Sequence, residues 1–160
     1  MEHLFARTEG TDAFWRTFSA ASNIDGTYDV VVFGSDAAMA NELCDLVLQG
    51  PKRATAGLLR DFGPDGEPMP RIGGHVVLVD GQGTPRAIWR TTDVRVGPLS
   101  SVDERFAWDE GEGDRTRDDW LRMHHVFFTN QAKRQGFRMH DDIETVFERF
   151  AIVWPPEHAD

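Results

Sequence analysis

The sequence predicts an α+β fold, in which a small mixed or mainly antiparallel sheet curls into a β-barrel flanked by helices. Three apolar segments, over 28–33, 75–79 and 145–154, have the composition of strands, and a fourth over 87–96 alternates between apolar and polar residues. The turn signal at 80–83 joins two of them as an antiparallel hairpin. Helical segments do not separate the strands regularly, which argues against a doubly wound parallel sheet and favours a barrel with helices outside.

Helix and strand signals alternate in the first fifty residues. Thr11 is a suitable N-cap for a helix over 12–22, where aromatic and apolar residues recur at helical spacing. The strand over 28–33 follows, and Gly34-Ser35-Asp36 then begins a second helix with an apolar stripe along one side.

The second helix is expected to end sharply. Gly50 is placed as a left-handed C-terminal residue, and Pro51 cannot continue the helix. The chain therefore turns at these two residues and presents 52–55 at the start of an extended run over 54–59.

Residues 63–136 are expected to contain two loops and two helices in addition to the hairpin. Glycine and proline punctuate 63–74, which predicts a loop, and 103–108 has the pattern of a short helix. The acidic run 109–114 follows it. Thr116 then caps a longer helix that Gly136 ends.

Size and charge limit the classes of function. A chain of 160 residues predicts one domain, and the single cysteine, Cys44, excludes an internal disulfide. No apolar run is long enough for a signal peptide or a membrane span, which predicts a cytoplasmic protein with no membrane partner. A net charge of −10 argues against a general nucleic-acid coat protein but allows a small basic pocket, and no DNA partner is expected.

Lys52 is unusual because the chain has two lysines and fifteen arginines. A lysine can lose its proton when it is desolvated or placed beside another cation, whereas an arginine stays charged. Arg53 supplies such a cation, and Thr55 supplies a hydroxyl three residues on. The pattern indicates that a tight turn at this position requires an amine that can titrate or donate a hydrogen bond. A general replacement of lysine by arginine at the other basic sites would give the same composition.

A second segment, Glu110-Gly111-Glu112-Gly113-Asp114-Arg115, puts three carboxylates in a glycine-rich run. Thr55 could act as a nucleophile, Lys52 could take its proton or stabilise an oxyanion, and Glu112 could orient the lysine or shuttle the proton. Alternatively, Glu110, Glu112 and Asp114 could hold magnesium or manganese, which prefer oxygen ligands. A solvated acidic loop is the plain alternative to both.

Two further features stand near this run. His124 and His125 are adjacent on a helix and point about 100° apart, so they cannot easily share a metal. We expect His124 on the inner face and His125 more exposed, both with structural roles. Trp108, beside the acidic run, is a candidate for stacking on a base.

Taken together, these motifs resemble the ASCH domain family, whose barrel is similar to that of the PUA RNA-binding domain. The resemblance covers about residues 28–156, and it leaves 1–27 as an N-terminal helical extension packed on a single ASCH unit over 28–160. The motifs that carry it are Gly50-x-Lys52-x-x-Thr55-Ala56, Arg90-Thr91-Thr92-Asp93-Val94, the run from Glu110 to Thr116, the helix with Trp120, His124 and Phe127-Phe128, and Glu148-Arg149-Phe150.

The resemblance implies a cleft for single-stranded RNA or a modified nucleoside. Some bacterial relatives are amidohydrolases of N-acetylated cytidine that use a threonine, a lysine and a glutamate, which fall here on Thr55, Lys52 and Glu112. Other relatives are similar to metal-assisted ribonucleases, which would need magnesium or manganese, whereas the amide reaction requires no cofactor. The residues expected to contact the substrate are Arg53, Arg90, Trp108, Glu110 and Arg115.

This chain departs from the family pattern at Pro51, where a basic residue is common. The change removes one cation from the cleft and weakens the case for a polyanionic ligand. Two functions without catalysis stay open on the sequence: an RNA-binding module that uses the same cleft, and a regulatory protein that binds a small metabolite. The sequence does not predict an oligomeric state.

Overall fold

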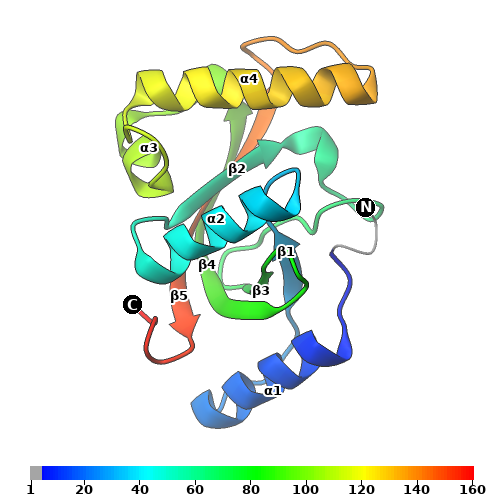
Figure 1. Ribbon diagram of the computed structural model, residues 1–160, viewed down its shortest axis with the longest axis vertical. Helices are drawn as coiled ribbons and strands as arrows, with labels where there is room; N and C mark the ends of the chain where they lie inside the picture. The colour runs from blue at the N-terminus through cyan, green and yellow to red at the C-terminus, as the bar shows by residue number, and fades with distance from the viewer. Residues whose placement is uncertain (1–4) are drawn as a thin grey trace.

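The computed structural model describes residues 5–160, which form four α-helices and one five-stranded sheet (Figure 1). The helices are α1 (Glu9–Ser22), α2 (Ala37–Gln49), α3 (Glu104–Glu110) and α4 (Arg117–Gln135), with short 3₁₀ turns η2 (Leu59–Asp61) and η3 (Leu99–Ser101). The strands are β1 (Asp29–Val32), β2 (Ala54–Leu58), β3 (His75–Val79), β4 (Pro85–Pro98) and β5 (Glu144–Trp154).

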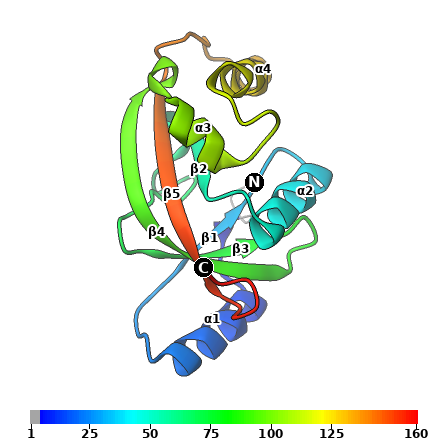
Figure 2. The ribbon, with the colours of Figure 1, turned by 90° about the vertical axis from the view of Figure 1, so that its left-hand side faces the viewer.

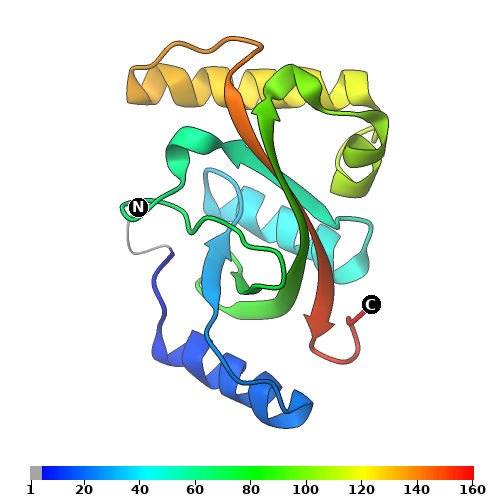
Figure 3. The same cartoon turned by 180° about the vertical axis from the view of Figure 1, so that it is seen from behind.

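The sheet has the order β1-β3-β4-β5-β2. The β1–β3 pair is parallel and the other three pairs are antiparallel. The long strands β4 and β5 bend along their length, so the sheet curls into a half-barrel whose edge strands are β1 and β2 (Figures 2 and 3). The α+β class and the mixed sheet predicted from the sequence are confirmed, and the barrel is open rather than closed.

The two faces of β3 bury different clusters, because successive side chains of a strand point to opposite faces. Val76 and Leu78 pack under α2, with an aromatic stack in which the Trp89 ring lies between Phe33 and Phe150. The alternate residues of β3 lie in a second cluster with Trp15 and Phe18 of α1. A third cluster fills the space between β2, β5 and the helices α3 and α4, which lie at the top of Figure 1.

The ends of the helices follow the capping signals with three corrections. The helix α3 runs to Glu110, so the first two residues of the acidic run are helical, and Gly50 has a positive φ (64°) but a ψ of 155°, outside the left-handed helical region. Thr8, and not Thr11, is the N-cap of α1, which begins three residues before the predicted start. Thr11 instead completes a capping box with Thr8. Thr116 caps α4 and Gly136 ends it, as predicted.

The division of the chain at residues 27 and 28 stays a prediction, although α1 is joined to the sheet through a shared buried cluster. Across residues 5–160, no helix has the length and apolar character needed to cross a membrane.

Candidate functional site

The turn after α2 fixes the backbone of Lys52. Helix α2 ends at Gly50, and the Gly50–Pro51 peptide bond is cis. The Lys52 amide then donates to the carbonyl of Leu46 (3.2 Å), and the Arg53 amide donates to the carbonyl of Asp109 in α3 (2.7 Å). The turn is therefore held between α2 and α3 before β2 begins.

The side chain of Lys52 is buried, with 1% of its surface exposed. Its Nζ donates to Oε2 of Glu112 (2.9 Å) and to the carbonyl of Ala54 (2.8 Å), and it lies 5.2 Å from the centre of the Phe33 ring. The Ala54 carbonyl belongs to the peptide that leads into Thr55. The structure thus brings Lys52 and Glu112 into contact and puts the ammonium one peptide unit from Thr55.

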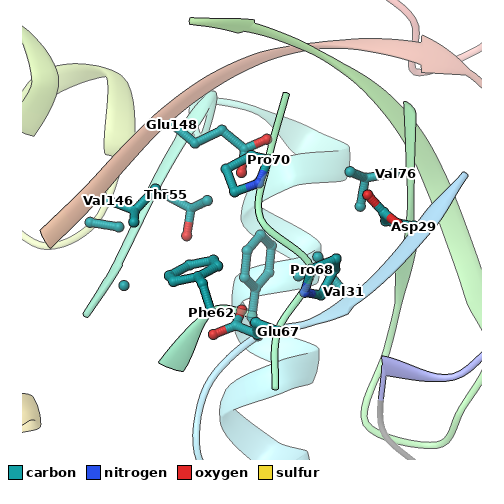
Figure 4. Close-up of a pocket in the computed structure, with 13 residues that line it drawn as sticks. Asp29, Val31, Thr55, Phe62, Glu67, Pro68, Pro70, Val76, Val146 and Glu148 are labelled. Carbon is teal, nitrogen blue, oxygen red and sulfur yellow. The ribbon is translucent and has the colours of Figure 1, made fainter. Parts of the chain in front are cut away.

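Thr55 opens onto a cavity of about 40 Å³, which Phe33 also lines (Figure 4). This volume holds a few water molecules, since one water needs roughly 10–15 Å³. The charged side chains of the lining are three carboxylates, Asp29, Glu67 and Glu148. Lys52 and Glu112 are not part of the lining, so Phe33 is the side chain that contacts the ammonium and faces the cavity.

Two of these carboxyls have raised pKa values. Glu148 is opposite Thr55 in the β2–β5 register and accepts hydrogen bonds from Trp89 (3.0 Å) and Thr91 (2.6 Å). Burial raises the pKa of Glu148, against the effect of these two bonds. Burial, followed by the charges of Asp61 and Glu148, raises the pKa of Glu67 to about 7.

The acidic run supplies the carboxylate that contacts Lys52. Glu110 ends α3 with 1% of its surface exposed, and its Oε1 lies 2.8 Å from Nε2 of His124 in α4. Gly111 takes a left-handed conformation (φ 72°), and the reversed chain then brings Glu112 to Lys52. Both glutamates face inward, one held by a histidine and the other by a lysine.

The pKa values of Glu110 and Glu112 are shifted in opposite directions. Burial would raise the pKa of Glu110, but the charges of His124 and then Lys52, with hydrogen bonds, outweigh it and hold the pKa at about 2. Burial raises the pKa of Glu112; Lys52 opposes this and the negative charge of Glu110 adds to it. Burial would lower the pKa of His124, but the charge and hydrogen bond of Glu110 raise it overall.

The ASCH domain family model matches residues 29–154, which include Lys52, Thr55, Glu110, Glu112 and His124. The chain belongs to the ASCH domain family.

Two solved structures resemble this ASCH protein over nearly its whole length. The ASCH domain from Lactobacillus crispatus JV V101 has a TM-score of 0.82 and 29% identity, and the match covers 94% of this chain and 98% of that one. A protein from Enterococcus faecalis V583, described under the family model DUF984, has a TM-score of 0.81 and 33% identity, with 91% and 88% covered. No curated protein matches the chain.

The structure places two residues predicted to contact substrate in internal contacts. The Arg53 guanidinium pairs with Asp160 and donates to the carbonyls of Val47 and Lys52, so it braces the turn that carries the lysine. Arg115 stacks 3.6 Å over the ring of Trp108 and donates to its carbonyl. Their substrate contacts stay predictions.

Of the other three residues with predicted substrate contacts, Glu110 is buried against His124, whereas Trp108 and Arg90 are both exposed. Trp108 is 57% exposed, so a base could reach the ring from outside. Arg90 is exposed on β4, opposite His75 in the register, and is not part of the cavity lining.

The three carboxylates proposed as metal ligands do not form a ready ligand set. Glu110 contacts His124, Glu112 contacts Lys52, and Asp114 is exposed, with its backbone amide donating to Asp119. Within residues 5–160, no three acidic, histidine or cysteine side chains gather as a metal site would require. Magnesium or manganese stays a prediction tied to cleavage of RNA.

Three residues of the site were not identified from the sequence. Glu148 could have been found, because it lies on β5 between Val146 and Phe150 at the spacing of one buried face. Asp29 and Glu67 carry no such signal, since one begins a strand and the other lies in an irregular loop that folds over the cavity (Figure 4).

We predict that Gly111→Ala destabilises the protein more than Gly136→Ala. Both glycines end helices with positive φ (72° and 75°), so both variants carry the cost of a left-handed alanine, about 1 kcal/mol. At Gly111 a Cβ would also lie 2.9 Å from the backbone nitrogen of Lys52, whereas at Gly136 the space is open. Urea unfolding should show an additional loss of at least about 1 kcal/mol for Gly111→Ala. Equal losses would contradict the close packing of Gly111 on the lysine turn.

We also predict that Glu67→Gln stabilises the protein at alkaline pH. A carboxyl whose pKa rises from 4.5 to about 7 on folding does not alter stability below pH 4.5. It destabilises the folded state increasingly up to pH 7 and fully above it. Unfolding free energies should therefore agree at pH 4 and differ by roughly 1–3 kcal/mol at pH 8. The exposed Glu157→Gln is the control, and a difference that does not depend on pH would refute the assignment.

Proposed function

We propose that this ASCH protein is a hydrolase that cleaves the amide bond of a small N-acylated nucleoside, of which N-acetylcytidine is the test compound. One observation carries the proposal. The buried Lys52 ammonium bonds both the Glu112 carboxylate and the carbonyl of the peptide leading into Thr55. An amine and a carboxyl thus contact each other one peptide unit from Thr55, whose side chain lines a cavity with room for an acyl group but not for a whole nucleoside.

In the proposed reaction, the Thr55 hydroxyl attacks the acyl carbon, and the Lys52 ammonium stabilises the oxyanion that forms. Lys52 passes one proton to Glu112 and accepts the proton of the hydroxyl. The raised pKa of Glu112 makes its carboxylate a stronger proton acceptor than an ordinary glutamate. The C–N bond then breaks as the leaving nitrogen takes a proton from Lys52, which recovers one from Glu112. Water then hydrolyses the threonine ester to a carboxylic acid and free Thr55.

The charge around Thr55 supports a small neutral substrate over an RNA strand. Three carboxylates line the cavity, and the whole chain carries a net charge of −10. Both repel phosphates, whereas carboxylate oxygens accept hydrogen bonds from the N–H groups of an acylated amino-heterocycle. Cleavage of single-stranded RNA is the second candidate, supported by the exposed Trp108 and Arg115.

The test compares N-acetylcytidine with a labelled single-stranded RNA, each with and without EDTA. We expect deacylation that EDTA does not affect. Lys52→Ala and Thr55→Ala should each lower kcat by about 10²–10⁴ with a small change in KM. Lys133→Ala and Thr92→Ala remove the other lysine and an exposed threonine, and they should retain full activity.

Each other result identifies a different function. Strand cleavage that EDTA abolishes would replace the proposal with a metal-assisted ribonuclease. Salt-dependent RNA binding without turnover would indicate a binding module. Binding of the nucleoside without turnover and without salt dependence would indicate a metabolite-binding protein.

A further inference from the structure

His124 faces a hydrogen-bond acceptor at each of its ring nitrogens. Nδ1 lies 2.8 Å from the carbonyl of Trp120, and Nε2 lies 2.8 Å from Oε1 of Glu110. The Trp120 carbonyl can only accept, so Nδ1 carries a proton. Nε2 then either accepts from a protonated Glu110, as a neutral pair, or donates to an ionised Glu110, as an ion pair. In the ion pair His124 is an imidazolium, whose two N–H donors satisfy both contacts.

The surroundings of the ring also favour the charged form. The ring stacks on Trp120 at a centroid distance of 3.7 Å and an interplanar angle of 13°, and an aromatic face attracts a cation. The charged groups that act on it are Glu110 from α3 and Glu112 from the loop after α3, and Lys52 from the α2–β2 turn lies near both of these carboxyls. Two cations and two carboxylates therefore balance one another in this buried region.

Glu110 connects the histidine to the proposed catalytic pair. It is fully enclosed, and it lies close enough to Glu112 and Lys52 for their charges to act on it. Its second oxygen, Oε2, is buried and accepts from no N–H group among the described residues, and its hydrogen bond with the Glu112 carboxyl requires a proton on Glu112. A carboxylate so placed depends on the nearby cations to stay ionised.

We propose that His124 is a positioning residue: as a doubly protonated imidazolium it holds Glu110 as a charged carboxylate, and that charge sets when Glu112 releases its proton beside Lys52. The protonation of His124 stands without the proposed hydrolase activity. Its effect on turnover rests on that function.

The direction of the effect follows from electrostatics. With His124 charged, the negative charge of Glu110 contributes to the raised pKa of Glu112. Without a cation at this position, burial favours the neutral form of Glu110. Glu112 then loses its negative neighbour and releases its proton at lower pH.

The experiment uses His124→Gln, which keeps an N–H donor but cannot carry the charge. His125→Gln is the matched control, because His125 is adjacent on α4, half exposed and near Asp141. Nitrogen-15 NMR of the histidine rings at pH 7.5 reads the protonation of His124, and the two variants assign the signals. Carbon-13 NMR of the glutamate carboxyls across a pH titration reads Glu110 and Glu112. Neither reading needs a substrate.

We expect both His124 nitrogens to be protonated at pH 7.5, where an unperturbed histidine, with a pKa near 6.5, is mostly neutral. In His124→Gln the titration of Glu112, and with it the acidic limb of kcat/KM, should move to lower pH, while His125→Gln matches the parent. A neutral His124 ring would overturn the proposal. So would an unchanged Glu112 titration in a folded His124→Gln protein, which would leave the histidine a packing role. An inactive protein with the expected NMR result would reject the hydrolase and keep this inference.

Discussion

The structure around the candidate site depends on one buried cation. The Lys52 ammonium is almost fully enclosed, and such a group is tolerated only when charged or polar partners replace the water it loses. Glu112 and the Ala54 carbonyl are those partners. Because one comes from the acidic run and the other from β2, satisfying the ammonium requires both segments to meet at the end of α2.

A second pair extends this arrangement. Glu110 and His124 repeat the combination of a carboxylate and a cation, next to the first pair and deeper in the protein. The four charged groups come from α3, α4, the α2–β2 turn and the loop after α3. The network therefore links α2 to the helices α3 and α4, which lie on the same side of the sheet (Figure 2). Four charges of alternating sign make Glu112 titrate differently from Glu110, although only one residue separates them in the sequence.

The sequence predicted the features that depend on local patterns. The Gly50–Pro51 turn, the Thr116 cap and the 80–83 hairpin each follow from residues close together in the chain. It could not decide between Glu110 and Glu112, because spacing by two suggests a shared face in a strand and different faces in a helix. Here Glu110 ends a helix and Gly111 reverses the chain, so both face inward.

Contacts between distant residues were the other limit. Arg53 pairs with Asp160, 107 residues away, and no local pattern indicates such a partner. Glu67 reaches the Thr55 cavity from a loop without periodicity. The family resemblance identified the lysine, the threonine and the glutamate, but not the carboxylates that give the cavity its charge.

A double-mutant cycle on the free energy of unfolding tests the central claim most directly, with Lys52→Met, Glu112→Gln and the combined variant measured at pH 7. If the buried ion pair determines how these segments meet, Lys52→Met alone should be strongly destabilising, because it leaves a buried carboxyl without its partner. The double variant should then be more stable than the sum of the two losses predicts, by at least about 1.5 kcal/mol. Losses that add to within roughly 0.5 kcal/mol would show that the two residues fold independently, and the account of the site would be wrong.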